Sequence, residues 1–498
     1  MTRWMMAAGV AAVLGLPAAA HAETACGDLA KTALPHAEVL SATVEKAGAG
    51  EACKVAVASH PTTDSNIRLE VWIPLGQAWN GKFVQVGNGG FAGQVPTGQL
   101  RGIAARGYAV SGTDDGHQSP VGTSAAWALG HHEKLIDFGW RALKETTDIS
   151  KALISAQKGL APKRSYFAGC SDGGREALME AQRFPTDFDG IVAGAPANYM
   201  SQLFGISAAQ HQALNAPGGY LDPAALKLLQ TSVLAQCAEG GPFVRDPASC
   251  HFDPAKLQCK AGQSDGCLTA PQVHSARVMY EGRRDPRTGK VAFPGFTPGA
   301  EAASGSWPAW VTGANPETHS RAAGYQFSSN AFKYFAFGDP GFDFLKMDLG
   351  AQFDKAHATM GPIIDAPNPN LAAFKKHGGK LLQYHGWNDP AIPARSSIVY
   401  YEDVQKTMGP TTGFYKLYLV PGMLHCAGGA SPTSVDWLGQ LDAWVSEDKA
   451  PAAITAASTP SGGGATQLLC PYPGVARKSG EAWSCAAAPS SKSSKRKF

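Results

Sequence analysis

The segment Gly169-Cys170-Ser171-Asp172-Gly173 decides the fold class of this 498-residue chain. It matches the G-x-S-x-G turn, in which a serine lies on a sharp bend between a strand and a helix. Ser165–Ala168 supplies the predicted strand before the bend, and Arg175–Arg183 the predicted helix after it. Glycines allow the tight backbone path that such a bend needs. The pattern therefore predicts an accessible, nucleophilic Ser171.

Two residues that follow late predicted strands complete a candidate catalytic set. His425 comes after the strand Tyr415–Val420, and Asp389 comes after the strand Lys380–Tyr384. A serine hydroxyl needs an adjacent base, and a carboxylate orients and stabilises the imidazole that serves as this base. The chain order Ser, Asp, His is that of α/β-hydrolases. Other candidates fit this order and context less well: His117, His131, His132, His385, Asp436 and Asp442.

An acyl-transfer site also needs two N–H donors for the developing oxyanion. The residue after the nucleophile, Asp172, should provide one backbone donor. The second should come from the glycine-rich segment Gly87–Phe91, with Gly90 as first choice and Gly89 as second. The alternative is that this segment is an ordinary glycine turn.

Strands that alternate with helices predict a mostly parallel sheet, here an α/β fold of the α/β-hydrolase type. The alternation of strands and helices stops between residues 198 and 372, which are rich in proline and aromatic residues. We predict that residues 23–197 and 373–487 form the catalytic domain and that residues 198–372 form a large inserted lid domain. The remaining predicted strands are Ile67–Ile73, Lys82–Val86, Tyr108–Gly112 and Gly190–Ala193, and a long helix is predicted over Leu135–Ala156.

The ten cysteines suggest an oxidising compartment. Pairing of near neighbours is the simplest arrangement, although sequence alone does not fix the connectivity. It would leave Cys170 and Cys426 for each other, next to Ser171 and His425. The other four pairs would be Cys26–Cys53, Cys237–Cys250, Cys259–Cys267 and Cys470–Cys485.

The two ends of the chain carry signals unrelated to the fold. Residues 1–22 have a basic start, an apolar stretch and an Ala-His-Ala cleavage site, and so predict a signal peptide and a secreted or periplasmic protein. The net charge of +3 comes largely from the Ser/Lys-rich residues 488–498, which we predict to be a disordered tail. The rest is near neutral. We therefore expect neither a nucleic-acid nor a membrane partner.

With these residues in view, the chain resembles the tannase/feruloyl esterase family of α/β-hydrolases. The family signature is a Cys-Ser pair, a distant Asp and a His-Cys pair whose cysteines are bonded, here Cys170-Ser171, Asp389 and His425-Cys426. The likeness runs from about Cys26 to Cys485. It implies a serine carboxylesterase for small esters of aromatic acids. Members include feruloyl esterases, tannases and the bacterial hydrolase of mono(2-hydroxyethyl) terephthalate.

One departure from the family concerns calcium. Many members carry an aspartate-rich calcium loop between the cysteines that correspond to Cys237 and Cys250, but here only Glu239 and Asp246 are acidic. Calcium prefers six to eight oxygen ligands, several of them carboxylates. We therefore expect no metal or other cofactor. Two functional alternatives stay open at this point: an amidase or peptidase with the same triad, and a non-catalytic binding protein. The sequence does not predict the oligomeric state.

Overall fold

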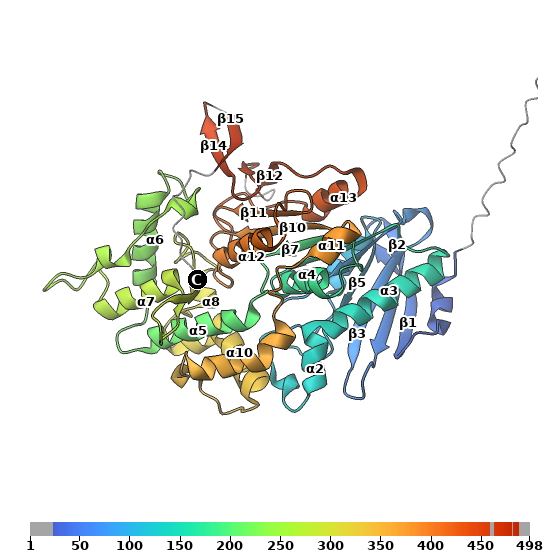
Figure 1. Ribbon diagram of the computed structural model, residues 1–498, viewed down its shortest axis with the longest axis horizontal. Helices are drawn as coiled ribbons and strands as arrows, with labels where there is room; N and C mark the ends of the chain where they lie inside the picture. Colours follow the sequence, from blue (N-terminus) through green and yellow to red (C-terminus); the bar gives the residue numbers. More distant parts are fainter. Residues whose placement is uncertain (1–22, 459–462, 481, 488–498) are drawn as a thin grey trace, which may run out of the picture.

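A twisted nine-stranded sheet forms the centre of the molecule (Figure 1). The computed structural model describes residues 23–458, 463–480 and 482–487, so the predicted signal peptide and basic tail lie outside the described residues. The strand order is β1-β2-β3-β5-β4-β6-β7-β10-β11. The pairs from β1 to β5 are antiparallel, and those from β5 to β11 are parallel. The strands are Ala37–Ala47 (β1), Gly50–Ser59 (β2), Ile67–Pro74 (β3), Lys82–Val86 (β4), Ala109–Thr113 (β5), Arg164–Cys170 (β6), Gly190–Gly194 (β7), Lys380–Gly386 (β10) and Tyr415–Val420 (β11).

Helices cover both faces of this sheet, as a mostly parallel sheet requires. On one face, α3 (Ala142–Lys158), α4 (Asp172–Arg183) and α12 (Ala394–Met408) share a buried apolar core with the strands. On the other face, α1 (Thr97–Ala104) and α13 (Trp437–Glu447) do the same. The predicted α/β-hydrolase architecture is thus confirmed, with every predicted strand present to within a few residues.

Two features of the part that contains the sheet differ from the prediction. The edge hairpin β1–β2 was not predicted; most residues of β1 are exposed, and this strand has no long apolar run to mark it. The predicted helix Leu135–Ala156 is interrupted: α2 (His132–Ile136) and α3 are separated by a π-helical turn over Asp137–Arg141. The buried Arg175 guanidinium donates hydrogen bonds to the carbonyls of that turn, and these contacts compete with regular helix.

The chain between β7 and β10 leaves the sheet and gathers at one end of the molecule (Figure 1). One apolar cluster there, which includes Leu221, Leu226 and Met279, belongs to this segment alone. Another is shared with the sheet side, where Phe91 and Phe138 meet insertion residues. We call residues 198–372 the insertion; its status as a separate lid domain stays a prediction. Its helices and strands are α5 (Met200–Asn215), α6 (Pro223–Cys237), α7 (Ala270–Glu281), β8 (Arg283–Arg284), β9 (Val291–Phe293), α8 (Trp307–Trp310), α9 (Ala323–Asn330) and α10 (Ala351–Ile364), with α11 (Ala372–His377) leading back to β10.

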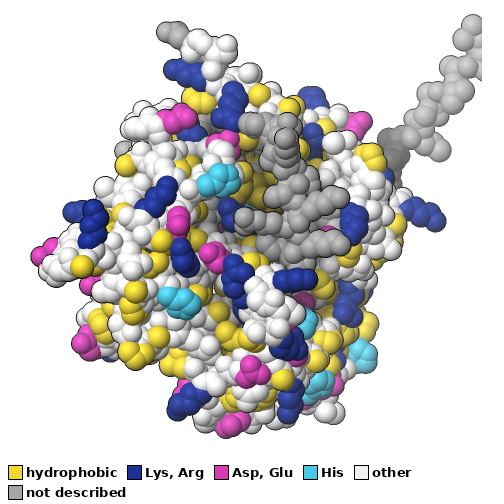
Figure 2. Space-filling model, turned by 60° about the vertical axis from the view of Figure 1, so that its left-hand side comes forward, with side chains coloured by type: hydrophobic (Ala, Val, Ile, Leu, Met, Phe, Trp, Pro, Cys, Tyr) yellow, Lys and Arg dark blue, Asp and Glu magenta, His cyan; other side chains and the backbone are white. Residues whose placement is uncertain are grey.

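Two small hairpins complete the C-terminal part. β12 (Ile454–Ala457) pairs with β13 (Thr466–Leu469), and β14 (Val475–Ser479) with β15 (Ala482–Ala486). Within the described part of the chain, no helix has the length and apolar character needed to cross a membrane. On the face that brings the insertion forward, Lys and Arg side chains are scattered among acidic and apolar ones (Figure 2).

Candidate active site

Ser171 lies on the bend between β6 and α4, as the sequence predicts. Its backbone has φ 66° and ψ −120°, a combination that a residue with a side chain rarely adopts. Hydrogen bonds hold this bend: the Ser171 N–H donates to the Gly194 carbonyl, and the Ala197 N–H donates to the Ser171 carbonyl. Such strain at a single residue persists where the surroundings enforce it. It presents the Ser171 hydroxyl at the carboxyl end of the sheet.

The structure brings Ser171, His425 and Asp389 into one hydrogen-bonded chain. The Ser171 Oγ lies 2.8 Å from His425 Nε2, and His425 Nδ1 lies 2.7 Å from Asp389 Oδ2. Ser171 follows β6, Asp389 follows β10 and His425 follows β11, so the carboxyl ends of parallel strands bring together residues that are 254 positions apart in the chain. Asp436 and Asp442 lie elsewhere: Asp436 caps α13, and Asp442 bonds Lys82 and two tyrosines.

Asp389 is held as a buried carboxylate. Its second oxygen, Oδ1, accepts hydrogen bonds from the N–H groups of Ala391 and Ile392 at 2.8 and 2.9 Å. Burial alone would raise the pKa of Asp389, but His425 and His385 outweigh it and hold the pKa well below its usual value. His385 is fully buried, with Nε2 3.3 Å from Asp389 Oδ2. An ionised Asp389 can therefore fix the orientation of the His425 ring.

All five predicted cysteine pairs are at disulfide distance, with S–S separations of 1.97–2.02 Å. The Cys170–Cys426 bond joins the residue before Ser171 to the residue after His425. It therefore ties the β6 bend directly to the loop after β11. Among the described residues no cysteine is free.

The two predicted oxyanion donors both face the Ser171 cavity. Gly90 and Asp172 line that cavity together with Ser171, whereas Gly89 lines a different one. Gly90 has φ +61°, and a Cβ atom there would lie 2.8 Å from the Gly122 carbonyl oxygen, so the position requires glycine. This geometry favours Gly90 over Gly89.

The Ser171 cavity has a volume of about 110 Å³ and lies between the sheet and the insertion. That is on the scale of the roughly 150 Å³ cavity that holds one benzene ring. Its walls are mainly apolar, and Trp310 also packs at 5.1 Å from the His425 ring. The residues that line it are Gly90, Phe91, Ser171, Asp172, Ala197, Met200, Leu203, Phe204, Ile206, Ser207, Gln210, Phe296, Trp310, Val311, Gly324, Phe327, Ser328, Pro390, Ala391 and Ile392.

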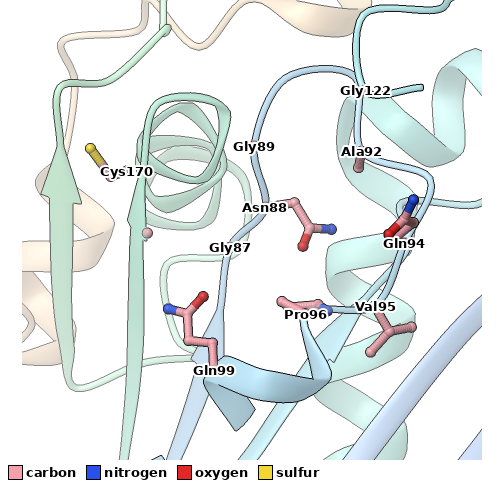
Figure 3. Close-up of a pocket in the computed structure, with 11 residues that line it drawn as sticks. Gly87, Asn88, Gly89, Ala92, Gln94, Val95, Pro96, Gln99, Gly122 and Cys170 are labelled. Atoms are coloured by element: carbon pink, nitrogen blue, oxygen red, sulfur yellow. The ribbon is translucent and has the colours of Figure 1, made fainter. Parts of the chain in front are cut away.

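A second cavity, of about 540 Å³, is lined by Gly87, Asn88 and Gly89 (Figure 3). The amide side chains of Gln94 and Gln99 also line it, and Cys170 lies at one side. Because Gly90 lines the other cavity, the segment 87–90 separates the two. A candidate oxyanion loop thus runs between an apolar cavity and a more polar, open one.

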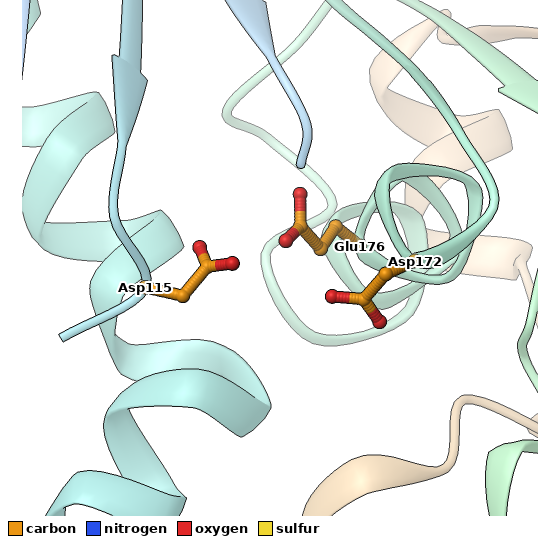
Figure 4. A group of neighbouring side chains, drawn as sticks. All are labelled: Asp115, Asp172 and Glu176. Carbon is orange, nitrogen blue, oxygen red and sulfur yellow. The ribbon is translucent and has the colours of Figure 1, made fainter. Parts of the chain in front are cut away.

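Behind this loop lies a buried carboxyl cluster that the sequence analysis missed (Figure 4). Asp115, Asp172 and Glu176 each place a carboxylate oxygen within 4.8 Å of the others, and all are at most 1 % exposed. Arg175 donates to Asp172 at 2.5 and 3.2 Å and supplies positive charge. Burial and the Asp172 charge raise the pKa of Asp115 to about 8. With this guanidinium in place, the sealed cluster suits shared protons better than a divalent cation, which prefers more oxygen ligands.

Glu176 connects the cluster to the candidate oxyanion loop. Its Oε2 accepts a hydrogen bond from the Asn88 N–H at 3.0 Å, and the Asn88 carbonyl accepts one from the Gly173 N–H at 2.7 Å. The contact is so close that a Cβ atom on Gly87 would lie 2.6 Å from Glu176 Oε2. The only sequence signal was the i, i+4 spacing of Asp172 and Glu176 on one helix. Asp115 is brought to them only by the fold.

The family model for tannase and feruloyl esterase matches residues 53–493. This chain belongs to the tannase and feruloyl esterase family. The resemblance seen in the sequence is thereby confirmed, and the chain is a carboxylic ester hydrolase that acts on small-molecule esters, like its family. Family membership argues against the non-catalytic alternative.

Relatives of this family match over almost the whole chain. An uncharacterised esterase of Xanthomonas campestris pv. campestris is 36% identical, covering 93% of this chain and 90% of the relative. The mono(2-hydroxyethyl) terephthalate hydrolase of Piscinibacter sakaiensis is 31% identical, covering 90% of this chain and 87% of the relative. The crystal structure of feruloyl esterase B from Aspergillus oryzae superposes with a TM-score of 0.85 at 26% identity, covering 93% of this chain and 99% of the other.

Proposed function

We propose that the protein is an exported serine esterase that hydrolyses esters of aromatic acids, such as hydroxycinnamic or gallic acid, through an acyl-enzyme. The observation that carries the proposal is the hydrogen-bonded chain from Ser171 through His425 to Asp389 at the wall of an aromatic-lined cavity. An apolar cavity with a few polar groups suits an aromatic acyl group.

In the proposed mechanism, His425 Nε2 takes the Ser171 proton as Oγ attacks the ester carbonyl. Asp389 stabilises the imidazolium, and the N–H groups of Gly90 and Asp172 hold the oxyanion. His425 then gives the proton to the leaving alcohol, which leaves an acyl-Ser171 ester. Water, activated by His425, attacks this ester, releases the acid and restores Ser171. The Cys170–Cys426 bond keeps nucleophile and base in register.

The proposal is tested with wild-type and Ser171→Ala protein on methyl ferulate, methyl gallate, mono(2-hydroxyethyl) terephthalate and a short p-nitrophenyl ester. We expect Ser171-dependent turnover with a burst of acyl-enzyme on the p-nitrophenyl ester. Full hydrolysis by Ser171→Ala would refute the mechanism. Equal turnover of matched amides would favour the amidase alternative.

Two further properties belong to the proposal. We propose that the protein is exported and loses residues 1–22, and the disulfides support this proposal. N-terminal sequencing of the mature protein tests it.

We also propose that the Cys237–Cys250 loop binds no calcium. Asp246 there already pairs with Arg477 at 2.7 Å, and Glu239 is exposed, so the loop offers too few free carboxylates. One tightly held calcium per chain would contradict this.

A further inference from the structure

Two buried polar groups on the insertion face the Ser171 cavity without a hydrogen-bond partner. Gln210, on α5, is 2 % exposed, and Ser328, on α9, is 0 % exposed. Both line the cavity, and neither Gln210 Nε2 nor Ser328 Oγ has a hydrogen-bond partner among the described residues. A buried polar group without a partner is unfavourable, and most native proteins avoid it. At a cavity wall, the missing partner can be a ligand.

Three other polar side chains at this wall, Ser207, Asp172 and Ser171, already have hydrogen-bond partners. Ser207 Oγ donates to the Gly324 carbonyl at 3.0 Å. The Asp172 carboxylate accepts two hydrogen bonds from Arg175. Ser171 bonds to His425. Among the described residues that line this wall, Gln210 and Ser328 are thus the fully buried ones whose side chains have unmet hydrogen bonds that a bound acyl group would complete.

The chemistry of the wall also limits the charge of that acyl group. Among the described residues, no Lys or Arg lines the cavity, and its one ionisable side chain, Asp172, is acidic and paired. A carboxylate brought here would lose its water without gaining a cation, which is strongly unfavourable. A neutral hydroxyl or methoxyl group meets no such penalty. Its oxygen can accept from the Gln210 amide, and a hydroxyl can exchange a hydrogen bond with Ser328.

From these observations we propose that Gln210 and Ser328 select esters of phenolic aromatic acids, and reject acids that carry a second carboxylate on the ring. The ring would lie among Phe91, Trp310 and Phe327, where the Phe91 and Phe327 centroids are 5.0 Å apart. The inference rests on the proposed function, since it concerns the acyl group that Ser171 receives. It separates this chain from its terephthalate-monoester relative by substrate class.

The test compares kcat/KM on three methyl esters that differ only at the para position: methyl 4-hydroxybenzoate, methyl benzoate and monomethyl terephthalate. Methyl 4-hydroxycinnamate and methyl cinnamate form a second pair with a longer acyl chain. In at least one of the two pairs, we expect kcat/KM of the wild-type protein to be at least about tenfold higher for the phenolic ester than for the unsubstituted ester. We expect kcat/KM for monomethyl terephthalate to be lower than that for methyl benzoate by a similar factor.

Three variants assign the selectivity to residues. The phenolic preference is the ratio of kcat/KM for a phenolic ester to kcat/KM for its unsubstituted partner. Gln210→Leu and Ser328→Ala should each lower this ratio several-fold, and the double variant should bring it close to one. Ser207→Ala is the matched control: its hydroxyl lies on the same wall but is already bonded, so the preference ratio should stay at the wild-type value. A preference that persists in the double variant would overturn the proposal, as would a wild-type preference for the carboxylate.

Two further measurements keep the result decisive. If the double variant fails to fold, titration of Ser171→Ala protein with the same esters replaces it. The phenolic ester should then bind at least about tenfold more tightly than its unsubstituted partner, and equal affinities would overturn the proposal. Hydrolysis of p-nitrophenyl acetate separates the two hypotheses. Ser171-dependent turnover without phenolic preference contradicts only this inference, whereas absent turnover contradicts the proposed function.

Discussion

Replacing Glu176 by leucine should slow catalysis without weakening substrate binding. Glu176 does not line the Ser171 cavity; it accepts the Asn88 N–H at 3.0 Å and so fixes the loop that carries Gly90. Burial and the charges of Asp115 and Asp172 raise the pKa of Glu176 well above its usual value, which favours its neutral acid form. Glutamine is close in shape to that neutral acid, and its carbonyl can accept the same N–H.

The size of the effect follows from the hydrogen bond that is lost. Glu176→Leu leaves the buried Asn88 N–H without an acceptor, at a cost of about 1–3 kcal/mol, which the loop can relieve only by moving. Loss of one oxyanion donor lowers kcat by roughly 10²–10³, and a shift of about 1 Å by roughly 10². We therefore expect kcat to fall about a hundredfold in Glu176→Leu, with KM within about threefold. Glu176→Gln should stay within about threefold in both.

The assay is steady-state hydrolysis of a p-nitrophenyl ester, with the melting temperature of each variant measured alongside. A residue that only supported the fold would lower stability in Glu176→Leu without the selective loss of kcat. The reasoning is refuted if folded Glu176→Leu keeps wild-type kcat, or if Glu176→Gln is as slow as Glu176→Leu.

Three other predictions concern the neighbours of Ser171. Burial raises the pKa of Asp115 to about 8, so the folded protein keeps a proton that an unfolded aspartate releases near pH 4. Stability therefore falls as the pH rises from about 4 to about 8. In Asp115→Asn, the fall in melting temperature measured between about pH 5 and pH 8 should be smaller than in the wild-type protein. Asp389→Asn should lower kcat by roughly 10⁴ at unchanged fold, measured at neutral pH; a change under tenfold would contradict its orienting role. The Cys170→Ala/Cys426→Ala protein loses a cross-link over 256 residues, which stabilises the folded state by at most about 5 kcal/mol. Esterase activity should be lost at temperatures below the unfolding transition of this variant. Full activity at those temperatures would show that the bond does not position the site.

The sequence was sufficient for the parts of the site that depend on chain order. The bend at Ser171 has a local signature, and Asp389 and His425 each follow a strand whose apolar run is easy to recognise. Those strands, β10 and β11, continue the parallel part of the sheet beyond β6 and β7, so the carboxyl ends of all four strands lie at the same edge. The choice of Gly90 over Gly89 depended on the turn itself, and only the structure shows which glycine faces the cavity.

The parts that sequence reasoning missed depend on contacts between distant segments. The π-helical turn at Asp137–Arg141 exists beside Arg175, whose guanidinium bonds the carbonyls of Phe138 and Gly139 at 3.1 and 2.7 Å. Local helix propensity does not predict that a π-helical turn replaces regular α-helix here. The carboxyl cluster likewise looks like ordinary surface acids in the sequence, because burial of Asp115 against α4 is a property of the assembled sheet and helix. Local patterns find the candidate catalytic residues, whereas the contacts that support these residues come from distant segments of the chain.

The structure contains two sets of buried polar groups with unmet hydrogen bonds near Ser171, and they call for different explanations. Glu176 and Asp115 are absent from the walls of the Ser171 cavity, and their burial raises their pKa values, so protons shared within the cluster can satisfy them. Gln210 and Ser328 are neutral, so proton uptake cannot satisfy them, and both line the cavity that we propose holds the acyl group. We therefore expect the first set to affect the rate through the candidate oxyanion loop. The second set would act on the choice of substrate, because a ligand in the cavity can supply its missing partners.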